Sequence, residues 1–285
     1  MLSRGLLFSS ICVFAVLVSV QVLAQSFAAA VPYGSGGNGP NAVAVADLTG
    51  AGGPLDMVVA NWCTDVNCTA SSMGVLLGNG DGTFKPAVAY GSGGLYADSV
   101  AVADVNGDGK GDILVANCGF PKITKCANGN VGVLLGNGDG TFKPVVNYSL
   151  GAFGAASVAL ADVNGDGKLD LLVATGSASG SWVGVLLGNG DGTFQAVVTY
   201  STGGLTALSV AVADVNGDTK PDLVVANWCT DVNCTASSAG VLLGNGDGTF
   251  RTAVTYASGG LNANSVQVAD VNACLLYTSP SPRDS

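Results

Sequence analysis

The sequence lacks two residue types on which much enzyme chemistry depends. It has no histidine and no glutamate, so all 20 of its acidic residues are aspartate. A catalytic triad with histidine, a histidine-ligated zinc site and a glutamate acid or base therefore cannot be built from this chain. Lysine and arginine together number only 10, and the formal net charge is −10. We expect no nucleic-acid partner, because no basic surface is left to neutralise a phosphate backbone.

Charged residues are scarce overall, at 11% of the chain, whereas 48% of the residues are apolar and 43 are glycine. A disordered chain would carry more charge and fewer apolar residues, and a helical bundle would be rich in glutamate and lysine. Aspartate instead favours turns and metal loops with oxygen ligands. The composition therefore excludes a disordered chain and a helical bundle.

The first 24 residues have the pattern of a secretory signal peptide. Arg4 supplies the positive charge, an apolar run follows, and Val22-Leu23-Ala24 precedes the expected cleavage before Gln25. An uncleaved membrane anchor is the alternative, since the apolar run approaches the length that spans a bilayer. No later segment could span a membrane as a helix. We expect a secreted, periplasmic or cell-surface protein with no membrane span after cleavage.

Internal repeats predict the architecture. The segment GVLLGNGDGTF occurs four times, beginning at Gly74, Gly132, Gly184 and Gly240. An acidic loop recurs with it, opened by Asp47, Asp104, Asp162, Asp214 and Asp270. Each unit carries four short segments rich in Val and Leu and bounded by Gly, Asn or Asp, such as ILVAN and TFKPVVNY, which are typical of strands. Four antiparallel strands per repeat predict an all-β fold, a β-propeller of four-stranded antiparallel blades.

The chain also begins with part of a repeat. FAAAVPYGSGG from Phe27 matches FKPAVAYGSGG from Phe84 almost position for position. The matching segment in each repeat is the outermost strand, so the mature chain starts with an outer strand that has no blade of its own. In a closed propeller such a strand completes the last blade and removes an open sheet edge.

Two motifs connect the repeats to a known family. VAVADVNGDGKGDILVA and GVLLGNGDGTF resemble FG-GAP repeats, also called VCBS repeats, the units of the integrin α-chain propeller. The resemblance covers residues 27–272 and implies a propeller domain over residues 25–273. Propellers of that family usually have seven blades, whereas four complete blades and partial ones are present here. Bacterial secreted proteins with such repeats are common in the family.

The fifth unit begins as SVQVADVN and then loses every repeat signal. The run CLLYTSPSPRD resembles the translation of a transposase-type sequencing adapter. We therefore expect residues 274–285 to be a non-native tail, with the gene continuing beyond it. A short natural tail is the alternative, but it leaves the broken repeat unexplained.

The acidic loop has the ligand spacing of a calcium loop. Counted from its first aspartate, it offers side-chain oxygens at positions 1, 3 and 5, a backbone carbonyl at position 7 and a further carboxylate at position 9. Close carboxylates repel one another by on the order of 1–4 kcal/mol per pair, and a divalent cation reverses that sign. The predicted Ca²⁺ ligands are Asp104, Asn106, Asp108, Lys110 and Asp112; Asp162, Asn164, Asp166, Lys168 and Asp170; and Asp214, Asn216, Asp218, Lys220 and Asp222.

The copies of this loop are unequal. The first two sets follow the full pattern, whereas Thr219 replaces the glycine at position 6 of the third, where a positive φ disfavours a β-branched residue. We therefore predict two strong calcium sites and one site that is weaker or distorted. The loop from Asp47 to Asp56 keeps only its end carboxylates, and we predict no calcium there. An aspartate-rich turn without metal is the alternative for every copy. GNGDGT is explained entirely as a hairpin turn.

Six cysteines form local pairs between the second and third strands of their repeats. In an exported protein these pairs predict three small disulfides, Cys63–Cys68, Cys118–Cys126 and Cys229–Cys234. Two thiols in one loop cannot complete a zinc site. Up-and-down connectivity places the acidic loops and the GNGDGT turns on one face of the propeller and the cysteine loops on the other.

Three hypotheses for function follow from this arrangement. The first is a binding or adhesion module whose cysteine-loop face contacts a glycan or an extracellular protein through Trp62, Asp65, Asn67, Trp182, Trp228, Asp231 and Asn233. Tryptophans that only cap the ends of the core are the alternative. The second is the propeller part of a secreted polysaccharide-active enzyme, and the third is a surface scaffold joined to a missing C-terminal domain. We expect the chain not to be an enzyme itself.

Overall fold

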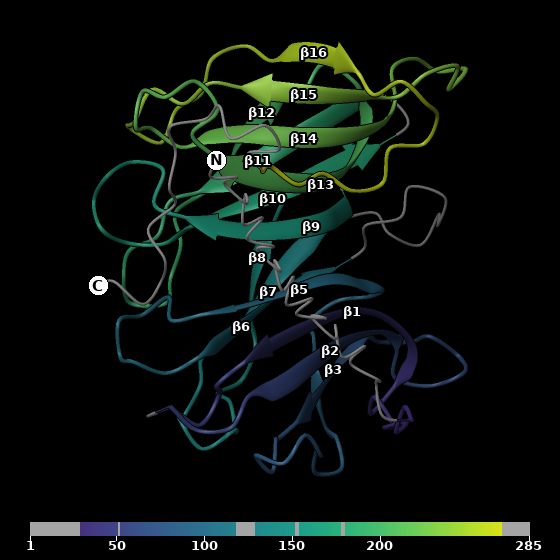
Figure 1. Cartoon of the computed structure of the whole chain (residues 1–285), viewed down its shortest axis with the longest axis vertical. Helices are drawn as coiled ribbons and strands as arrows, with labels where there is room; N and C mark the ends of the chain where they lie inside the picture. Colours follow the sequence, from purple (N-terminus) through teal and green to yellow (C-terminus); the bar gives the residue numbers. More distant parts are fainter. Residues whose placement is uncertain (1–28, 51, 118–128, 152–153, 178–179, 270–285) are drawn as a thin grey trace, which may run out of the picture. The chain divides into compact units, whose positions relative to one another are not determined.

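The computed structural model describes residues 29–50, 52–117, 129–151, 154–177 and 180–269. All of the secondary-structure elements in these ranges are β-strands. The same ranges contain no helix that is long and apolar enough to cross a membrane. The strands form four separate four-stranded antiparallel sheets, each in the order of the chain (Figure 1). The sheets are β1 (Asn38–Ala46) to β4 (Val88–Gly91), β5 (Ala97–Ala103) to β8 (Val146–Ser149), β9 (Gly154–Ala161) to β12 (Val198–Ser201), and β13 (Leu205–Ala213) to β16 (Val254–Ala257). The predicted all-β class and its four-stranded units are confirmed.

The middle strands of each sheet are the buried ones. They are β2 (Asp56–Cys63), β3 (Ser72–Leu76), β6 (Asp112–Asn117), β7 (Asn130–Leu134), β10 (Asp170–Ser177), β11 (Gly180–Leu186), β14 (Asp222–Cys229) and β15 (Ser238–Leu242). Their Val and Leu side chains form three apolar clusters, one between each sheet and the next. The near-continuous apolar runs of these strands are explained by burial on both faces.

The fourth segment of each unit is shorter than the sequence indicates. Instead of one strand it contains an isolated bridge, such as Gly78 to Phe84, and then a strand of four residues. The phenylalanine at the bridge packs edge-on against a tyrosine of the preceding unit, with ring centroids 5.3 Å apart for Tyr90 and Phe142. Tyr33 packs on Phe84 in the same way, at 5.5 Å. This contact supports the match between the segment around Tyr33 and the end of a repeat.

A buried aspartate anchors each sheet. Asp56 is 1% exposed, and its two carboxylate oxygens accept the N–H groups of Leu48 at 2.9 Å and of Gly78 at 2.8 Å. It thereby connects the loop after the first strand to the chain leaving the third. Asp112, Asp170 and Asp222 make the same two bonds in their own sheets.

The glycine in this anchor is required by space. A Cβ atom on Gly78 would lie 2.3 Å from the carbonyl oxygen of Leu55, and the equivalent glycines of the other sheets meet a carbonyl at 2.2–2.3 Å. The first glycine of GNGDGT is therefore fixed by the close approach of two backbones.

Hydroxyl and amide groups clamp neighbouring sheets together. Asn117 is fully buried, donates to the carbonyl of Ser92 at 3.0 Å and accepts from the hydroxyl of Ser71 at 3.3 Å, both in the preceding sheet. The fourth sheet repeats this clamp on the third through Asn227, Ser181 and Thr202. The second and third sheets meet differently: Gly129, Leu150 and Thr175 occupy the three corresponding positions, and Leu150 is 2% exposed.

Asp56 allows the anchor to be tested without interference from metal, because its loop lacks the carboxylates at positions 3 and 5. We expect Asp56→Asn to lower the free energy of unfolding by about 1–3 kcal/mol, because an amide nitrogen cannot accept one of the two buried N–H groups. Urea denaturation of the purified chain measures this change. Asp65→Asn is the control, since Asp65 is exposed and accepts a single N–H that an asparagine oxygen can also accept. Equal effects of the two substitutions would contradict the anchor.

Candidate functional site

The acidic loop after β5 folds around its first carboxylate. Asp104 Oδ1 accepts the N–H of Gly107 at 2.7 Å, and Oδ2 accepts the N–H of Gly109 at 2.8 Å. Asn106 and Asp108 then each accept the N–H two residues ahead, at 2.9 and 3.1 Å. Successive turns of this kind bring the side-chain oxygens of positions 1, 3 and 5 into one tight loop.

The loop after β9 has the same hydrogen bonds. Asp162 Oδ1 accepts from Gly165 at 2.7 Å, Oδ2 accepts from Gly167 at 2.8 Å, and Asn164 and Asp166 cap the N–H groups two residues on. The two loops predicted as strong calcium sites are therefore equal in backbone geometry.

The loop after β13 keeps this geometry despite Thr219. Asp214 Oδ2 accepts the N–H of Thr219 at 2.7 Å, as it does from glycine in the other copies. The φ angle of Thr219 is +68°, beside +77° for Gly109 and +79° for Gly167. The positive φ expected from the sequence is confirmed, whereas a distorted hydrogen-bond pattern is not observed.

Lysine at position 7 supplies a positive charge inside the loop. Lys110 Nζ lies 3.4 Å from Asp108 Oδ2, and Lys168 Nζ lies 3.8 Å from Asp166 Oδ2. Burial opposes ionisation of Asp108, but the N–H and ammonium of Lys110 outweigh it and lower the pKa of that carboxyl. In the third copy, Asp218 instead accepts from the amide of Asn216 at 3.2 Å.

The carboxylates at position 9 differ from the others in environment. Asp112 and Asp170 are fully buried, and burial raises the pKa of both carboxyls, although their backbone partners oppose the shift. Their two oxygens each accept a backbone N–H in the anchor described above. The same anchor exists at Asp56, in the loop that lacks acidic or amide side chains at positions 3 and 5, so we infer that it does not depend on metal. A further role for these residues as ligands stays a prediction.

The loops fit a calcium ion in donor chemistry but not as a cluster of carboxylates alone. Within the described ranges, no three or more His, Cys, Asp or Glu side chains are gathered in a way that could hold a metal ion. An ionised carboxylate has about four acceptor sites, so one that binds two or three N–H groups keeps capacity for a cation. The oxygens at positions 1, 3 and 5 and the carbonyl at position 7 are the group that could bind it.

The GNGDGT segments are hairpin turns, as predicted. Asn79 donates its N–H to the carbonyl of Thr83 at 2.9 Å, and Gly80 and Gly82 have φ values of +84° and +86°. In the second sheet the hydroxyl of Thr141, followed by its N–H, lowers the pKa of Asp139.

These turns lie beside the acidic loops. Gly192, in the turn of the third sheet, donates to the carbonyl of Val105 in the acidic loop of the second at 3.3 Å, and Gly248 donates to Val163 at 3.1 Å. The expected grouping of these two kinds of loop is confirmed.

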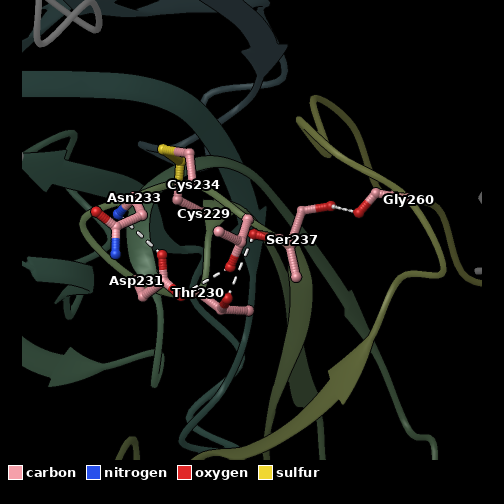
Figure 2. The surroundings of a disulfide bond; sticks show 9 residues. Cys229, Thr230, Asp231, Asn233, Cys234, Ser237 and Gly260 are labelled. Atoms are coloured by element: carbon pink, nitrogen blue, oxygen red, sulfur yellow. Dashed lines mark hydrogen bonds between the residues drawn. A yellow bond between two sulfur atoms is a disulfide. The ribbon is translucent and has the colours of Figure 1, made fainter.

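The cysteine loops are braced by disulfides and local hydrogen bonds. Cys63–Cys68 and Cys229–Cys234 are bonded, with Cα atoms 4.6 and 4.7 Å apart, which confirms two of the predicted pairs. Cys118 and Cys126 lie outside the described residues. Figure 2 shows the second loop, in which Asp231 accepts the N–H of Asn233 at 2.9 Å.

The predicted ligand residues fall into two groups. Asp65, Asn67, Asp231 and Asn233 are exposed at the tips of the cysteine loops, and the most exposed valines are beside them, Val66 at 90% and Val232 at 82%. Trp62, Trp182 and Trp228 are half-buried at the ends of strands or within them. The tryptophans therefore contact the sheets as well as solvent.

Three residues that the sequence analysis missed surround Trp62. Its Nε1 donates to Asp98 Oδ1 at 2.6 Å, and its ring packs edge-on against Tyr96 with centroids 5.8 Å apart. Asn41 Nδ2 donates to the same oxygen of Asp98 at 2.7 Å. Asn41 and Asp98 lie 57 residues apart, so only the contact between sheets brings them together.

Two comparisons with known proteins gave matches, and the first agrees with this architecture. A family model described as FG-GAP-like repeat matches residues 52–115, 123–173 and 172–225. The chain is also similar to phosphatidylinositol-glycan-specific phospholipase D of Bos taurus, at 33% identity over 153 residues. That match covers 44% of this chain and 18% of the bovine protein.

The strained threonine gives a direct test of loop geometry. We expect Thr219→Gly to raise the free energy of unfolding by about 1 kcal/mol, because a left-handed conformation costs a residue with a Cβ about 1–2 kcal/mol. Thr199→Gly in β12 is the control: it should lower stability by about 0.5–1 kcal/mol, because glycine is unfavourable in a strand. Chemical denaturation compares the two, and a destabilised Thr219→Gly chain would contradict the assignment.

Proposed function

The chain belongs to the FG-GAP-like repeat family and has a β-propeller fold, and from this we propose that it is an exported, calcium-binding module for adhesion to a glycan or protein. Its disulfides and repeats are those of an extracellular or secreted protein. Under this proposal the acidic loops stiffen one face and the cysteine loops contact the ligand with the other.

One observation carries the binding proposal. Residues 58–72 and 224–238 are identical, and they include both described cysteine loops. The acidic loops immediately before them differ strongly, as DLTGAGGPLD and DVNGDTKPD. Packing alone would not require identical exposed tips on two loops whose supporting loops have diverged, and rigid exposed loops on a β scaffold are where binding residues concentrate.

The rigidity of these tips supports the same conclusion. In each loop a disulfide, an aspartate-capped turn and a backbone bond such as Thr64 N–H to Ala70 O, at 2.9 Å, fix the chain around an exposed Asp-Val-Asn segment. A preorganised loop loses little conformational entropy on binding, so a larger share of the contact energy appears as affinity.

For calcium, the residues proposed as ligands are the side chains at positions 1, 3 and 5 and the carbonyl at position 7 of the acidic loops. The ion would supply positive charge among the carboxylates. Without it, Lys110 and Lys168 partly balance the charge of Asp108 and Asp166. The loop around Asp214 would bind more weakly, because Thr219 holds it in a strained backbone.

We further propose that this part of the chain is not itself an enzyme. The described carboxylates of the acidic loops and the turns are occupied with backbone N–H groups, hydroxyls or lysines. The bovine relative is named as a phospholipase, but the match covers too little of it to carry that activity over.

Calcium binding is tested by thermal unfolding with calcium and with a chelator. At a calcium concentration 100 times the dissociation constant, binding to the folded state should add about 2.7 kcal/mol per site, seen as a higher Tm. Asp108→Ala combined with Asp166→Ala should remove most of the shift, whereas Asp81→Ala, outside the acidic loops, should leave it. A folded chain with no calcium shift would leave the loops as metal-free turns.

The binding proposal is tested on immobilised targets: cellulose, chitin, xylan, mannan, polygalacturonate, collagen and fibronectin. We expect retention on at least one target, and at least a tenfold loss when both tips are changed together by Asp65→Ala, Asn67→Ala, Asp231→Ala and Asn233→Ala. The control is Asp81→Ala combined with Asp139→Ala, because both residues lie in GNGDGT turns and not in the cysteine loops. Retention on none of these targets would count against a binding module.

A further inference from the structure

We propose that the seam between the β1–β4 and β5–β8 sheets holds a binding subsite for a neutral sugar, formed by Trp62, Tyr96, Asp98 and Asn41. The inference rests on the binding function proposed above and specifies its ligand class. It adds a contact at a seam between two sheets to those proposed for the loop tips.

β-Bulges direct the two polar residues of this subsite. The strand register shifts between Pro40 and Ala42 in β1 and between Ala97 and Ser99 in β5, so Asn41 and Asp98 are the extra residues. A bulge re-aims the side chain of its extra residue. Here the re-aimed amide and carboxylate meet, with Nδ2 and Oδ1 2.7 Å apart.

The other described bulges do not offer this chemistry. The corresponding extra residues of β9 and β13 are Ala156 and Leu208, which have no polar side-chain atoms. Among the described sheets, only the first two therefore place a hydrogen-bonding pair at their seam. Asn41 is exposed and Asp98 is half-buried, so the pair is within reach of solvent.

Tyr96 has a left-handed backbone conformation, which is energetically unfavourable for a residue with a large side chain. Its φ is +54°, and the corresponding residues of other units, Gly39, Thr206 and Asn262, also have positive φ, from +56° to +63°. The fold therefore demands a left-handed residue at this position, for which glycine or asparagine is better suited. A tyrosine placed there against Trp62, with ring planes at 75°, indicates that the ring is used.

The fourth sheet provides an internal comparison. Trp228 has the same fifteen-residue neighbourhood as Trp62, but the positions that correspond to Tyr96 and Asp98 in the next unit are Asn262 and Asn264. The same tryptophan therefore lacks the second ring and the carboxylate there. If the tryptophan of the cysteine loop were sufficient to form a subsite, the sites at Trp62 and Trp228 would bind a sugar equally.

The combination of groups favours a neutral sugar. Aromatic faces accept the apolar face of a pyranose ring, and a carboxylate beside an amide can bind two adjacent hydroxyls. The chain has a net charge of −10, and no lysine or arginine is among the four residues, so an anionic sugar would be repelled.

The test uses the whole chain and five soluble neutral probes: cellohexaose, xylohexaose, chitohexaose, maltohexaose and mannohexaose, with hexagalacturonate as the anionic comparison. Isothermal titration and tryptophan fluorescence measure binding, and a thermal melt accompanies each variant. We expect at least one neutral probe to bind and hexagalacturonate not to bind. Trp62→Leu and Tyr96→Asn should each weaken binding at least tenfold, whereas the matched Trp228→Leu, at a tryptophan without the second ring and the carboxylate, should weaken it less than threefold.

Tyr96→Asn separates ligand contact from folding. Asparagine suits the left-handed backbone, so the Tm should stay the same or rise while affinity falls. Equal losses in Trp62→Leu and Trp228→Leu, or a loss of affinity only in variants with a lower Tm, would overturn the subsite. Binding to immobilised collagen or fibronectin without binding to any neutral probe would overturn it too, and would leave the proposed binding function standing.

Discussion

The buried aspartate at the start of each second strand connects the parts of a unit. Asp56 and its three counterparts each satisfy two backbone N–H groups that would otherwise be buried without partners. Because one N–H belongs to the loop after the first strand and the other to the chain leaving the third, a single side chain sets how two hairpins meet. The strand register, the acidic loop and the GNGDGT turn all follow from that junction, and the chain bears the desolvation of a carboxylate to keep it.

Much of this structure could be predicted from the sequence. Repeat spacing, apolar runs and turn residues give the number of strands, their order and the grouping of loops, and two cysteine pairs form as expected. The sequence could not show that Asp112 has a different role from Asp108. Within a single copy of the acidic loop, an anchoring aspartate at position 9 fits the regular spacing of metal ligands as well as a ligand would. Asp56 distinguishes the two roles, since it makes the same anchor in a loop that has no carboxylate at position 5. Trp62 was found from sequence, but Asp98 was not, because a bulge in another sheet brings it there.

The loops at the two ends of the sheets are held in different ways. On one, carboxylates satisfy backbone N–H groups within a few residues, so the loops and turns are held from within. On the other, disulfides hold short loops whose tips are exposed, and Trp62 joins the first two sheets beneath them through Asp98 and Tyr96. Rigidity is thus achieved by polar chemistry on one face and by covalent and aromatic contacts on the other, which leaves the second face free to present side chains.

The clamp between sheets also has a genetic consequence. The buried asparagine of a unit is satisfied by a predecessor that carries the hydroxyl pair, as Asn117 is by Ser71 and Ser92, whereas Asn61 Oδ1 in the first sheet has no partner among the described residues. A unit with Thr175 instead follows one with Gly129 and Leu150. Near-identical repeats invite recombination that deletes, copies or reorders units in the gene. Only rearrangements that keep matched neighbours would give a chain with satisfied seams, so the fold restricts the order in which such units can follow one another.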